Sequence, residues 1–226
     1  MHVLSCTLSR RTLLRGSALA LIALPASAIG MPAQTGAHQA GPGFAYIEVP
    51  TYVQQRNLSC EYASAVIAMA AFGAWMSEWA FDEVVPLSAN PHWGYRGDIN
   101  GQWGNTTDYG IYAEALAPPL STFGFWSETF YGQGDPWQLT ASLDAGFPVI
   151  VWLGLWGDQS FLEYTSDGTP YRLVPGMHVV VAHGYDDSGV SVSDPAKGTY
   201  TTYAWSDFMW MWNVLGGMAL SVGPSS

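Results

Sequence analysis

Cys60 is the residue of this sequence best suited to nucleophilic chemistry. The polar segment Gln54–Asn57 comes before it, and the apolar, alanine-rich segment 58–72 predicts a helix closed by Gly73. The cysteine would then lie near the start of that helix, where the positive end of the helix dipole stabilises a thiolate. We therefore expect a reactive thiol, and the alternative interpretation is an inert cysteine in the first turn of the helix.

A nucleophilic thiol needs a base, and His178 is the best placed histidine. It shares a predicted strand with His183, whereas the other histidines lie in segments that predict loops. Asp194 follows His178 by 16 residues, and the midpoint between them falls in the turn-forming segment 185–189. A hairpin folded there would place Asp194 directly opposite His178 on one face of the sheet, and His183 would face the other way.

The pattern of elements predicts an α+β fold in which the helix that carries Cys60 packs on an antiparallel sheet. Helices come first and strands follow residue 146, which favours this class over a doubly wound α/β fold. We expect strands over residues 46–55, 148–155, 177–185, 189–193, 200–205 and 219–222. We expect further helices over residues 77–85, over 107–116 with an end at Pro118–Pro119, from Asp135–Pro136 to Gly146, and from Ser206 to Leu215.

The composition excludes several classes of protein. The 226 residues carry a formal net charge of −11, which excludes a basic nucleic-acid-binding protein. Hydrophobic residues make up 49% and charged residues 11%, enough apolar material for one packed domain and too little charge for a disordered chain. No apolar run reaches the roughly 18 residues of a membrane span. The sequence also lacks a Gly-rich phosphate loop and paired metal-binding cysteines, so we expect neither a cofactor nor a metal.

Residues 1–28 are expected to be a secretory signal peptide. Three arginines precede a short apolar stretch, and the small residues Ala26 and Ala28 suit cleavage after residue 28. The pair Arg10–Arg11 resembles a twin-arginine export signal, with ordinary Sec export as the alternative. We therefore expect a secreted or otherwise extracytoplasmic protein of a prokaryote.

The rest of the chain would consist of a flexible lead-in, residues 29–43, and a folded domain, residues 44–226. Beyond residue 28, Cys60 is the one cysteine, so no disulfide can form within the chain. Four basic residues against 18 acidic ones give this part a net charge of −14. Such a surface repels polyanions.

Residues 90–107 are rich in glycine, asparagine and aromatic residues and predict a long surface loop. Trp93 and Trp103 of this loop could line a substrate groove. The loop has a single histidine, His92, and its scattered acidic residues lack the spacing of metal ligands. We therefore favour a loop that covers a cleft, or a structural loop, over a metal site.

Together these motifs resemble the papain-like cysteine peptidases. The motifs are, in order, Gln54 six residues before Cys60, Gly176 and His178 ahead of an apolar strand, Gly184–Tyr185 before a turn, and Asp194–Pro195. Within this group the sequence is most similar to the bacteriocin-leader-processing family, family thirty-nine of the cysteine peptidases, and to its exported stand-alone relatives. The resemblance covers residues 52–222 and implies the papain-like fold.

The resemblance also implies a role for each residue of the site. Cys60 would be the nucleophile, His178 the general base and acid, and Asp194 the group that orients His178. Gln54 would donate a hydrogen bond to the oxyanion together with a backbone N–H, and Gln55 is the less favoured donor.

The function implied is an exported, thiol-dependent peptidase that hydrolyses peptide or protein substrates through a thioester acyl-enzyme. Glu61 departs from the family, in which the residue after the nucleophile is usually small. A carboxylate there could raise the pKa of the thiol, so one alternative is an inactive papain-like scaffold that binds peptides or glycans through its aromatic loop. Acyl transfer to an amine would use the same residues. Cleavage of double-glycine leaders is not expected, because the members that perform it are usually fused to a transporter.

Overall fold

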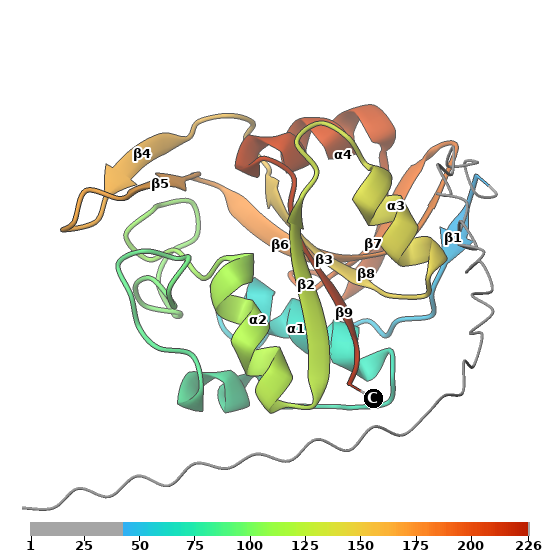
Figure 1. Ribbon diagram of the computed structural model, residues 1–226, viewed down its shortest axis with the longest axis horizontal. Helices are drawn as coiled ribbons and strands as arrows, with labels where there is room; N and C mark the ends of the chain where they lie inside the picture. The colour runs from blue at the N-terminus through green and yellow to red at the C-terminus, as the bar shows by residue number, and fades with distance from the viewer. Residues whose placement is uncertain (1–42, 226) are drawn as a thin grey trace, which may run out of the picture. The chain divides into compact units, whose positions relative to one another are not determined.

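An antiparallel sheet of seven strands forms the centre of the fold, in the order β2-β9-β3-β6-β7-β8 with β1 added to β6. The computed structural model describes residues 43–225. The predicted signal peptide, residues 1–28, and all of the predicted lead-in except Gly43 lie outside the described residues. Figure 1 shows the sheet with helices on both of its faces.

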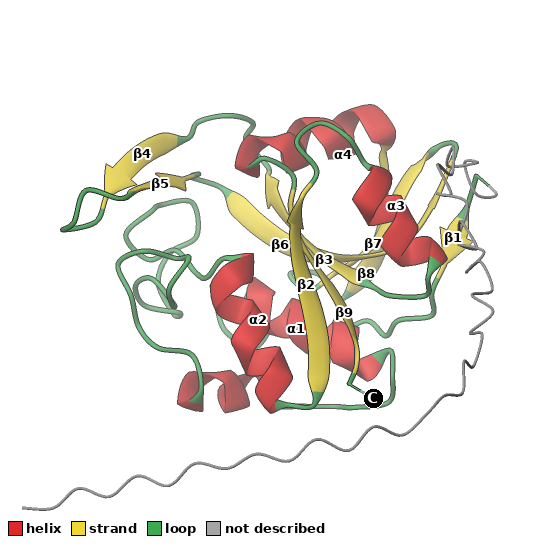
Figure 2. Ribbon diagram, in the orientation of Figure 1, coloured by secondary structure: helices red, strands yellow, loops and turns green. Residues whose placement is uncertain are grey.

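The elements confirm the expected α+β class, with the Cys60 helix packed on an antiparallel sheet (Figure 2). The strands of the sheet are β1 (Ala45–Tyr46), β2 (Phe125–Tyr131), β3 (Val149–Gly154), β6 (Met177–Asp186), β7 (Gly189–Asp194), β8 (Thr199–Ala204) and β9 (Met218–Pro224). A separate hairpin consists of β4 (Phe161–Tyr164) and β5 (Pro170–Leu173). The helices are α1 (Cys60–Ala70), α2 (Ala113–Thr122), α3 (Trp137–Asp144) and α4 (Trp205–Trp212), with 3₁₀ helices η1 (Glu78–Glu83) and η2 (Asn213–Leu215).

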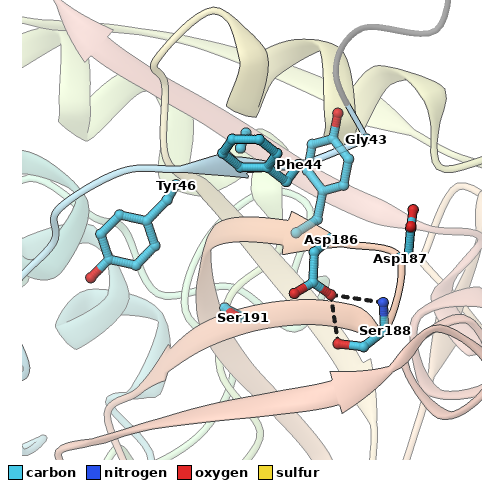
Figure 3. A pocket seen from close by; sticks show the side chains of 9 residues that line it. Gly43, Phe44, Tyr46, Asp186, Asp187, Ser188 and Ser191 are labelled. Atoms are coloured by element: carbon cyan, nitrogen blue, oxygen red, sulfur yellow. Dashed lines mark hydrogen bonds between the residues drawn. The ribbon is translucent and has the colours of Figure 1, made fainter.

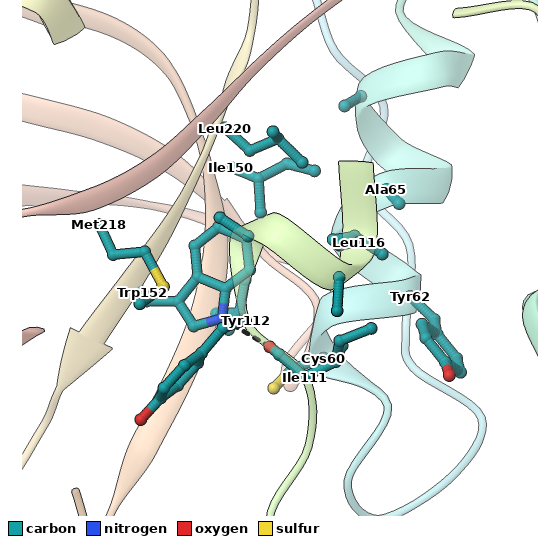
Figure 4. Packing of buried hydrophobic residues seen from close by; sticks show 14 of the residues in the cluster. Cys60, Tyr62, Ala65, Ile111, Tyr112, Leu116, Ile150, Trp152, Met218 and Leu220 are labelled. Atoms are coloured by element: carbon teal, nitrogen blue, oxygen red, sulfur yellow. Dashed lines mark hydrogen bonds between the residues drawn. The ribbon is translucent and has the colours of Figure 1, made fainter. Parts of the chain in front are cut away.

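Two hydrophobic clusters cover the two faces of the sheet. One contains residues of α1 and α2 together with Trp152 of β3, and the other contains residues of α3 and α4. All eleven residues of α1 are buried, which fits its mostly apolar sequence. Figure 4 shows part of the first cluster, where the indole N–H of Trp152 donates to the carbonyl of Ile111 at 2.9 Å. Among residues 43–225, no helix is long and apolar enough to cross a membrane.

The hairpin of β6 and β7 forms as expected, but its register differs. Val181 pairs with Ser193, which puts Asp194 level with Val180. His178 therefore lies two residues before the position of β6 that is opposite Asp194. The expectation of direct opposition was wrong, and the two residues are diagonal neighbours on one face of the sheet.

The difference arises at the turn, where Asp186 pairs with Gly189, so that the hairpin folds after residue 186. A β-bulge at His183 then moves the register by one residue. Counted from the turn without the bulge, Asp194 would lie level with Val181, and its side chain would point to the face opposite His178. The extra residue moves Asp194 by one position and returns it to the face of His178. The bulge therefore makes the approach of these two side chains possible.

Other expected elements differ at their ends. Of the expected strand 46–55, only Tyr46 is in a strand, because backbone groups further along bond to separate loops, as Gln54 does with Pro195 at 2.9 Å. The expected helix 107–116 is wrong. The helix is α2, which starts at Ala113 and continues through Pro118 and Pro119.

Tertiary packing overrides the prolines of α2, because Leu116 and Leu120 on either side of them are fully buried. The predicted cap Ser206 lies inside α4, which begins at Trp205. Asp135 does accept from the backbone N–H of Trp137 at 2.9 Å, at the start of α3. Strands β2, β4 and β5 were not expected from the sequence.

Candidate active site

Cys60 is the first residue of α1, at the helix start that the sequence predicts. Its side chain is buried, with 6% exposed. Ser64, one turn later, donates its hydroxyl to the carbonyl of Val179 at 3.2 Å. This bond ties the first turn of α1 to the first residues of β6, where His178 is found.

His178 and Asp194 form a hydrogen-bonded pair, with Nε2 of the ring 2.7 Å from Oδ1 of the carboxylate. A carboxylate can only accept, so Nε2 carries the hydrogen and Nδ1 is left to exchange a proton with a thiol. Asp194 also accepts from the backbone N–H of Ala196 at 3.0 Å and pairs with Lys197 at 3.3 Å. Burial opposes ionisation, but the hydrogen bond and charge of His178 hold the pKa of Asp194 below its usual value.

Cys60, His178, Asp194 and Gln54 all line one pocket of about 480 Å³. A more open pocket of about 570 Å³ lies between β1 and the β6–β7 turn (Figure 3). Acidic and hydroxyl side chains of the turn line that second pocket, and neither cysteine nor histidine does. The chemistry of the lining residues therefore selects the smaller pocket as the candidate active site.

The amide of Gln54 reaches this pocket but is engaged with the backbone. Its Nε2 donates to the carbonyls of Arg56 and Asn57, each at 2.9 Å, and Oε1 is buried without a partner among the described residues. Donation to an oxyanion requires Nε2 to release one of these carbonyls. Gln55 also lines the pocket, and its backbone N–H donates to Glu78 at 2.9 Å.

Glu61, the residue after the candidate nucleophile, is completely buried. Its Oε1 accepts from the backbone N–H of Ile111 at 3.0 Å, and its Oε2 accepts from the thiol of Cys60 at 3.3 Å. Gly110 has a φ of +131°, and a Cβ atom there would lie 1.9 Å from Oε1 of Glu61. Burial raises the pKa of Glu61 to about 7, although its hydrogen bonds act in the opposite direction.

The thiol of Cys60 is held in its neutral form. Burial raises its pKa, and the negative charge of Glu61 raises it further. The helix dipole, from which the sequence predicts a stabilised thiolate, is outweighed by these two effects. A thiolate at this position needs a positive partner, or a neutral Glu61.

The two tryptophans predicted to bind substrate differ in position. Trp103 lines the pocket, and its indole N–H donates to the carbonyl of Met177, next to His178, at 2.7 Å. Its ring meets Trp156 edge to face at 4.9 Å. Trp93 is 54% exposed and is not among the residues that line the pocket. The fold thus brings Trp103 to the candidate nucleophile and leaves Trp93 outside.

The other histidines of residues 43–225 serve the structure. The ring of His183 contacts Tyr46 and Tyr200, and burial lowers its pKa. Nδ1 of His92 lies 2.8 Å from Oε2 of Glu114, in the first turn of α2, so this contact joins the loop to the helix. Within the described residues, no group of three or more His, Cys, Asp or Glu side chains could hold a metal ion.

Several residues of the pocket were not found from the sequence, among them Lys197, Leu155 and Tyr203. Lys197 follows Asp194 by three residues, and this turn spacing is the signal that could have revealed their pairing. Leu155 follows the end of β3, and Tyr203 lies on β8. Only the strand order of the folded sheet brings these two side chains to the pocket.

Three solved structures share this fold. A C39-like peptidase from Bacillus anthracis superposes with a TM-score of 0.66 and 21% identity, covering 79% of this chain and 99% of that one. A double-glycine-motif protease from an AMS/PCAT transporter, in complex with the leader peptide, has a TM-score of 0.51 and 17% identity. The match covers 80% of this chain and 95% of that one. The peptidase domain of Streptococcus ComA, a bi-functional ABC transporter of a quorum-sensing pathway, has a TM-score of 0.50 and 15% identity. The match covers 79% of this chain and 100% of that one. At these low sequence identities, the three structures show a shared fold and nothing further.

The family follows from the sequence match. No curated protein matches the chain. The model of the Peptidase_C39 like family matches residues 46–220, more than half of the chain and a span that contains the whole candidate site. The match confirms the resemblance to the family-thirty-nine cysteine peptidases and their papain-like fold. The chain therefore belongs to the Peptidase_C39 like family and is a cysteine peptidase, a hydrolase.

Proposed function

We propose that the chain is an exported peptidase in which Cys60 is the nucleophile, His178 the general base and acid, and Asp194 the group that orients the imidazole. The observation that carries this proposal is the 2.7 Å hydrogen bond between His178 and Asp194, on the wall of the pocket that also contains Cys60. A thiol peptidase needs a nucleophile, a base and a group that fixes the tautomer of the base.

The proposed reaction has two steps. Nδ1 of His178 takes the proton of Cys60, the sulfur attacks the peptide carbonyl carbon, and the imidazolium then protonates the leaving amine, so that a thioester remains on Cys60. Water, deprotonated by the same nitrogen, attacks the thioester and releases the acid product and the thiol. Asp194 accepts the Nε2 hydrogen throughout and stabilises the imidazolium in both steps.

Two donors are proposed for the negative charge on the substrate oxygen. The backbone N–H of Cys60 has no acceptor within α1, because it belongs to the first turn of the helix. The amide of Gln54 is the second donor, once it releases Arg56 or Asn57. Donors placed at the oxyanion usually make the largest single contribution to catalysis of acyl transfer, and Gln54 becomes such a donor only after this rearrangement.

The proposed substrate is a peptide or an exposed protein segment. One structure of the same fold was solved in complex with a leader peptide. The walls of the pocket contribute Trp103, Leu155 and Tyr203, which offer apolar and aromatic contacts to peptide side chains.

The test is cleavage of a defined peptide mixture, followed by mass spectrometry of the products. Cys60→Ser and His178→Ala should each lower turnover by at least about a hundredfold, as removal of a nucleophile or base does. His92→Ala, outside the pocket, is the matched control and should retain activity. An acid-quenched sample should contain the thioester on Cys60, and added amine should not appear in the products. Unchanged turnover in Cys60→Ser would exclude the proposal.

A second candidate function, binding without cleavage, is favoured by one observation, the neutral thiol bonded to Glu61. Such a scaffold would bind peptides or glycans with equal affinity in the wild type and in Cys60→Ala. It would lose affinity in Trp103→Ala. No product would form at any pH.

We propose in addition that the protein is exported from a prokaryotic cell. The support is the sequence of residues 1–28, with Arg10–Arg11 ahead of an apolar stretch. A double substitution Arg10→Lys and Arg11→Lys should retain the protein in the cytoplasm of a bacterial host, measured by fractionation. If the variant is exported like the wild type, the twin-arginine route is wrong and Sec export takes its place.

A further inference from the structure

Glu61 contacts the nucleophile of the proposed mechanism, and the mechanism as written does not use it. Its carboxyl group is held from two sides, by the N–H of Ile111 on Oε1 and by the close packing of Gly110. These constraints direct Oε2 at Sγ of Cys60, 3.3 Å away. The protonation state of a fully buried carboxyl group that is fixed beside a nucleophile affects the protonation state of that nucleophile.

The contact has room for one hydrogen. When Glu61 is ionised, the S–H of Cys60 donates to Oε2, and the proton stays on sulfur. When Glu61 is protonated, the O–H at Oε2 can donate to a thiolate, which then carries the negative charge. Ionised Glu61 therefore opposes the nucleophile, and protonated Glu61 supports it.

We propose that Glu61 is a positioning residue that shares one proton with Cys60, so that the thiolate is available only while the carboxyl group of Glu61 is protonated. This inference rests on the proposed role of Cys60 as nucleophile. In the acidic state Glu61 and His178 each hold a proton and the sulfur holds none. As the pH rises, one of these protons leaves to water and the other passes to sulfur, which then donates to the Glu61 carboxylate.

The surroundings leave few other groups to titrate. Tyr62, Tyr95 and Tyr109 lie near Glu61, and burial raises the pKa of each phenol above its ordinary value, so all three stay neutral. Arg56, whose charge acts on Tyr62 and Tyr95, pairs with acidic side chains of η1. Cys60 is thus the ionisable group that contacts Glu61, and His178 shares the pocket with Cys60. Burial raises the pKa of Glu61 to about 7, within the range in which an enzyme can use it.

The test is the rate at which iodoacetamide alkylates Cys60 between pH 5 and 9, followed on the Cys60 peptide by mass spectrometry. In the wild type the rate should fall as the pH rises through about 7 and recover only in alkali. In Glu61→Gln, which keeps an acceptor for Ile111, the fall should be absent. At pH 8 the variant should react on the order of tenfold faster, as expected when a neighbouring like charge is removed.

Two variants separate this inference from the proposed function. Glu78→Gln changes another fully buried glutamate, which has no contact with the thiol, and should keep the wild-type profile. His178→Ala should lower the rate in acid but retain a step that depends on Glu61. Identical profiles for the wild type and Glu61→Gln would overturn the inference alone. Indifference of both to His178→Ala would overturn the proposed nucleophile, and this inference with it.

A second measurement uses the unaltered Glu61 side chain and does not depend on the folding of Glu61→Gln. The infrared band of a protonated carboxylic acid should disappear from the wild type as the pH rises through about 7. In Cys60→Ala the band should persist to higher pH, because Glu61 loses the S–H bond that stabilises its ionised form. An unchanged midpoint would show that no proton is shared.

Discussion

At the scale of single residues, the site is a hydrogen-bonded pair of side chains, His178 and Asp194, in the pocket that also contains the thiol of Cys60. Asp194 accepts from Nε2 of the His178 ring, and His178 lines the pocket. Asp194 has a second ionic partner, Lys197, whose side chain is 64% exposed. The contact of Asp194 with buried His178 should therefore contribute far more to kcat/KM than its contact with exposed Lys197.

Asp194→Asn should lower kcat/KM on the order of a hundredfold at neutral pH, because the amide orients the ring less well and no longer balances the imidazolium charge. Lys197→Met should change kcat/KM by less than about fivefold, since an exposed ion pair contributes at most about 1 kcal/mol. Both variants are measured on one peptide substrate. Equal losses in the two would mean that Lys197 takes a direct part in the site.

The candidate site could be predicted from residue types and spacing, since Cys60, His178 and Asp194 stand out in the sequence. Glu61 beside the thiol indicated that the pKa of the thiol could be raised, but the sequence did not show whether this effect outweighs that of the helix dipole. That outcome depends on the burial of Glu61 under Gly110 and Ile111, which follow it by about fifty residues and reach it only in the folded chain. A local argument from the helix dipole therefore gave the wrong direction for the thiol.

At the scale of elements, the loop before α2 joins the two halves of the site. The carbonyl of Ile99 accepts from the backbone N–H of Leu58 at 2.9 Å, just before Cys60. Trp103 of the same loop donates to the carbonyl of Met177, just before His178. The loop thus links the start of α1 to the start of β6.

Trp103→Phe should lower kcat/KM about two- to tenfold, because it removes one hydrogen bond worth about 1 kcal/mol and keeps an aromatic ring in the pocket. Trp93→Phe is the matched control from the same loop and should leave kcat/KM unchanged. The measurement is steady-state kinetics of both variants on one peptide substrate. An effect of Trp93→Phe as large as that of Trp103→Phe would place the substrate outside the pocket described above.

The strands of the second half could be predicted because each is a short apolar run between turn residues, as in β3, β6 and β7. The prolines of α2 misled the prediction, because burial of the leucines beside them outweighs the lost hydrogen bonds. Strand β2 pairs along its whole length with β9, almost a hundred residues later, and its sequence shows no clear alternation. Such long-range pairing cannot be recognised from local pattern alone.

At the scale of the whole molecule, the buried carboxyl group of Glu61 links folding to pH. Its pKa is about 7 in the folded chain, against an ordinary value of 4.5 for a glutamate exposed to water. Between these values the folded state binds more protons than the unfolded state, so a rising pH favours unfolding. His183, whose pKa burial lowers, acts in the opposite direction as the pH falls below about 6.5.

The free energy of unfolding of Glu61→Gln should therefore increase relative to that of the wild type as the pH rises from about 5 to about 8. Taking the difference between the two proteins cancels the contribution of His183. Urea denaturation at four pH values provides the measurement. A difference independent of pH would mean that Glu61 is ionised throughout.

The net charge of −14 in residues 43–225 also acts on substrates before they bind. A basic peptide should be cleaved with a higher kcat/KM at low ionic strength, and added salt should reduce this advantage. An acidic peptide with the same scissile bond should show the opposite salt dependence. The comparison needs only kcat/KM of the two peptides at two salt concentrations. An equal change of kcat/KM with salt for both peptides would rule out long-range attraction.

The bulge in β6 makes the hairpin sensitive to whether chain length changes by an odd or an even number of residues. Loss of one residue between His178 and the turn would exchange the faces of the two strands relative to each other, so that Asp194 and His178 could no longer meet. Loss of two would keep the faces and shift the carboxylate along the strand. Relatives of this chain can therefore vary the length of this hairpin in steps of two, and single-residue changes must occur in compensating pairs.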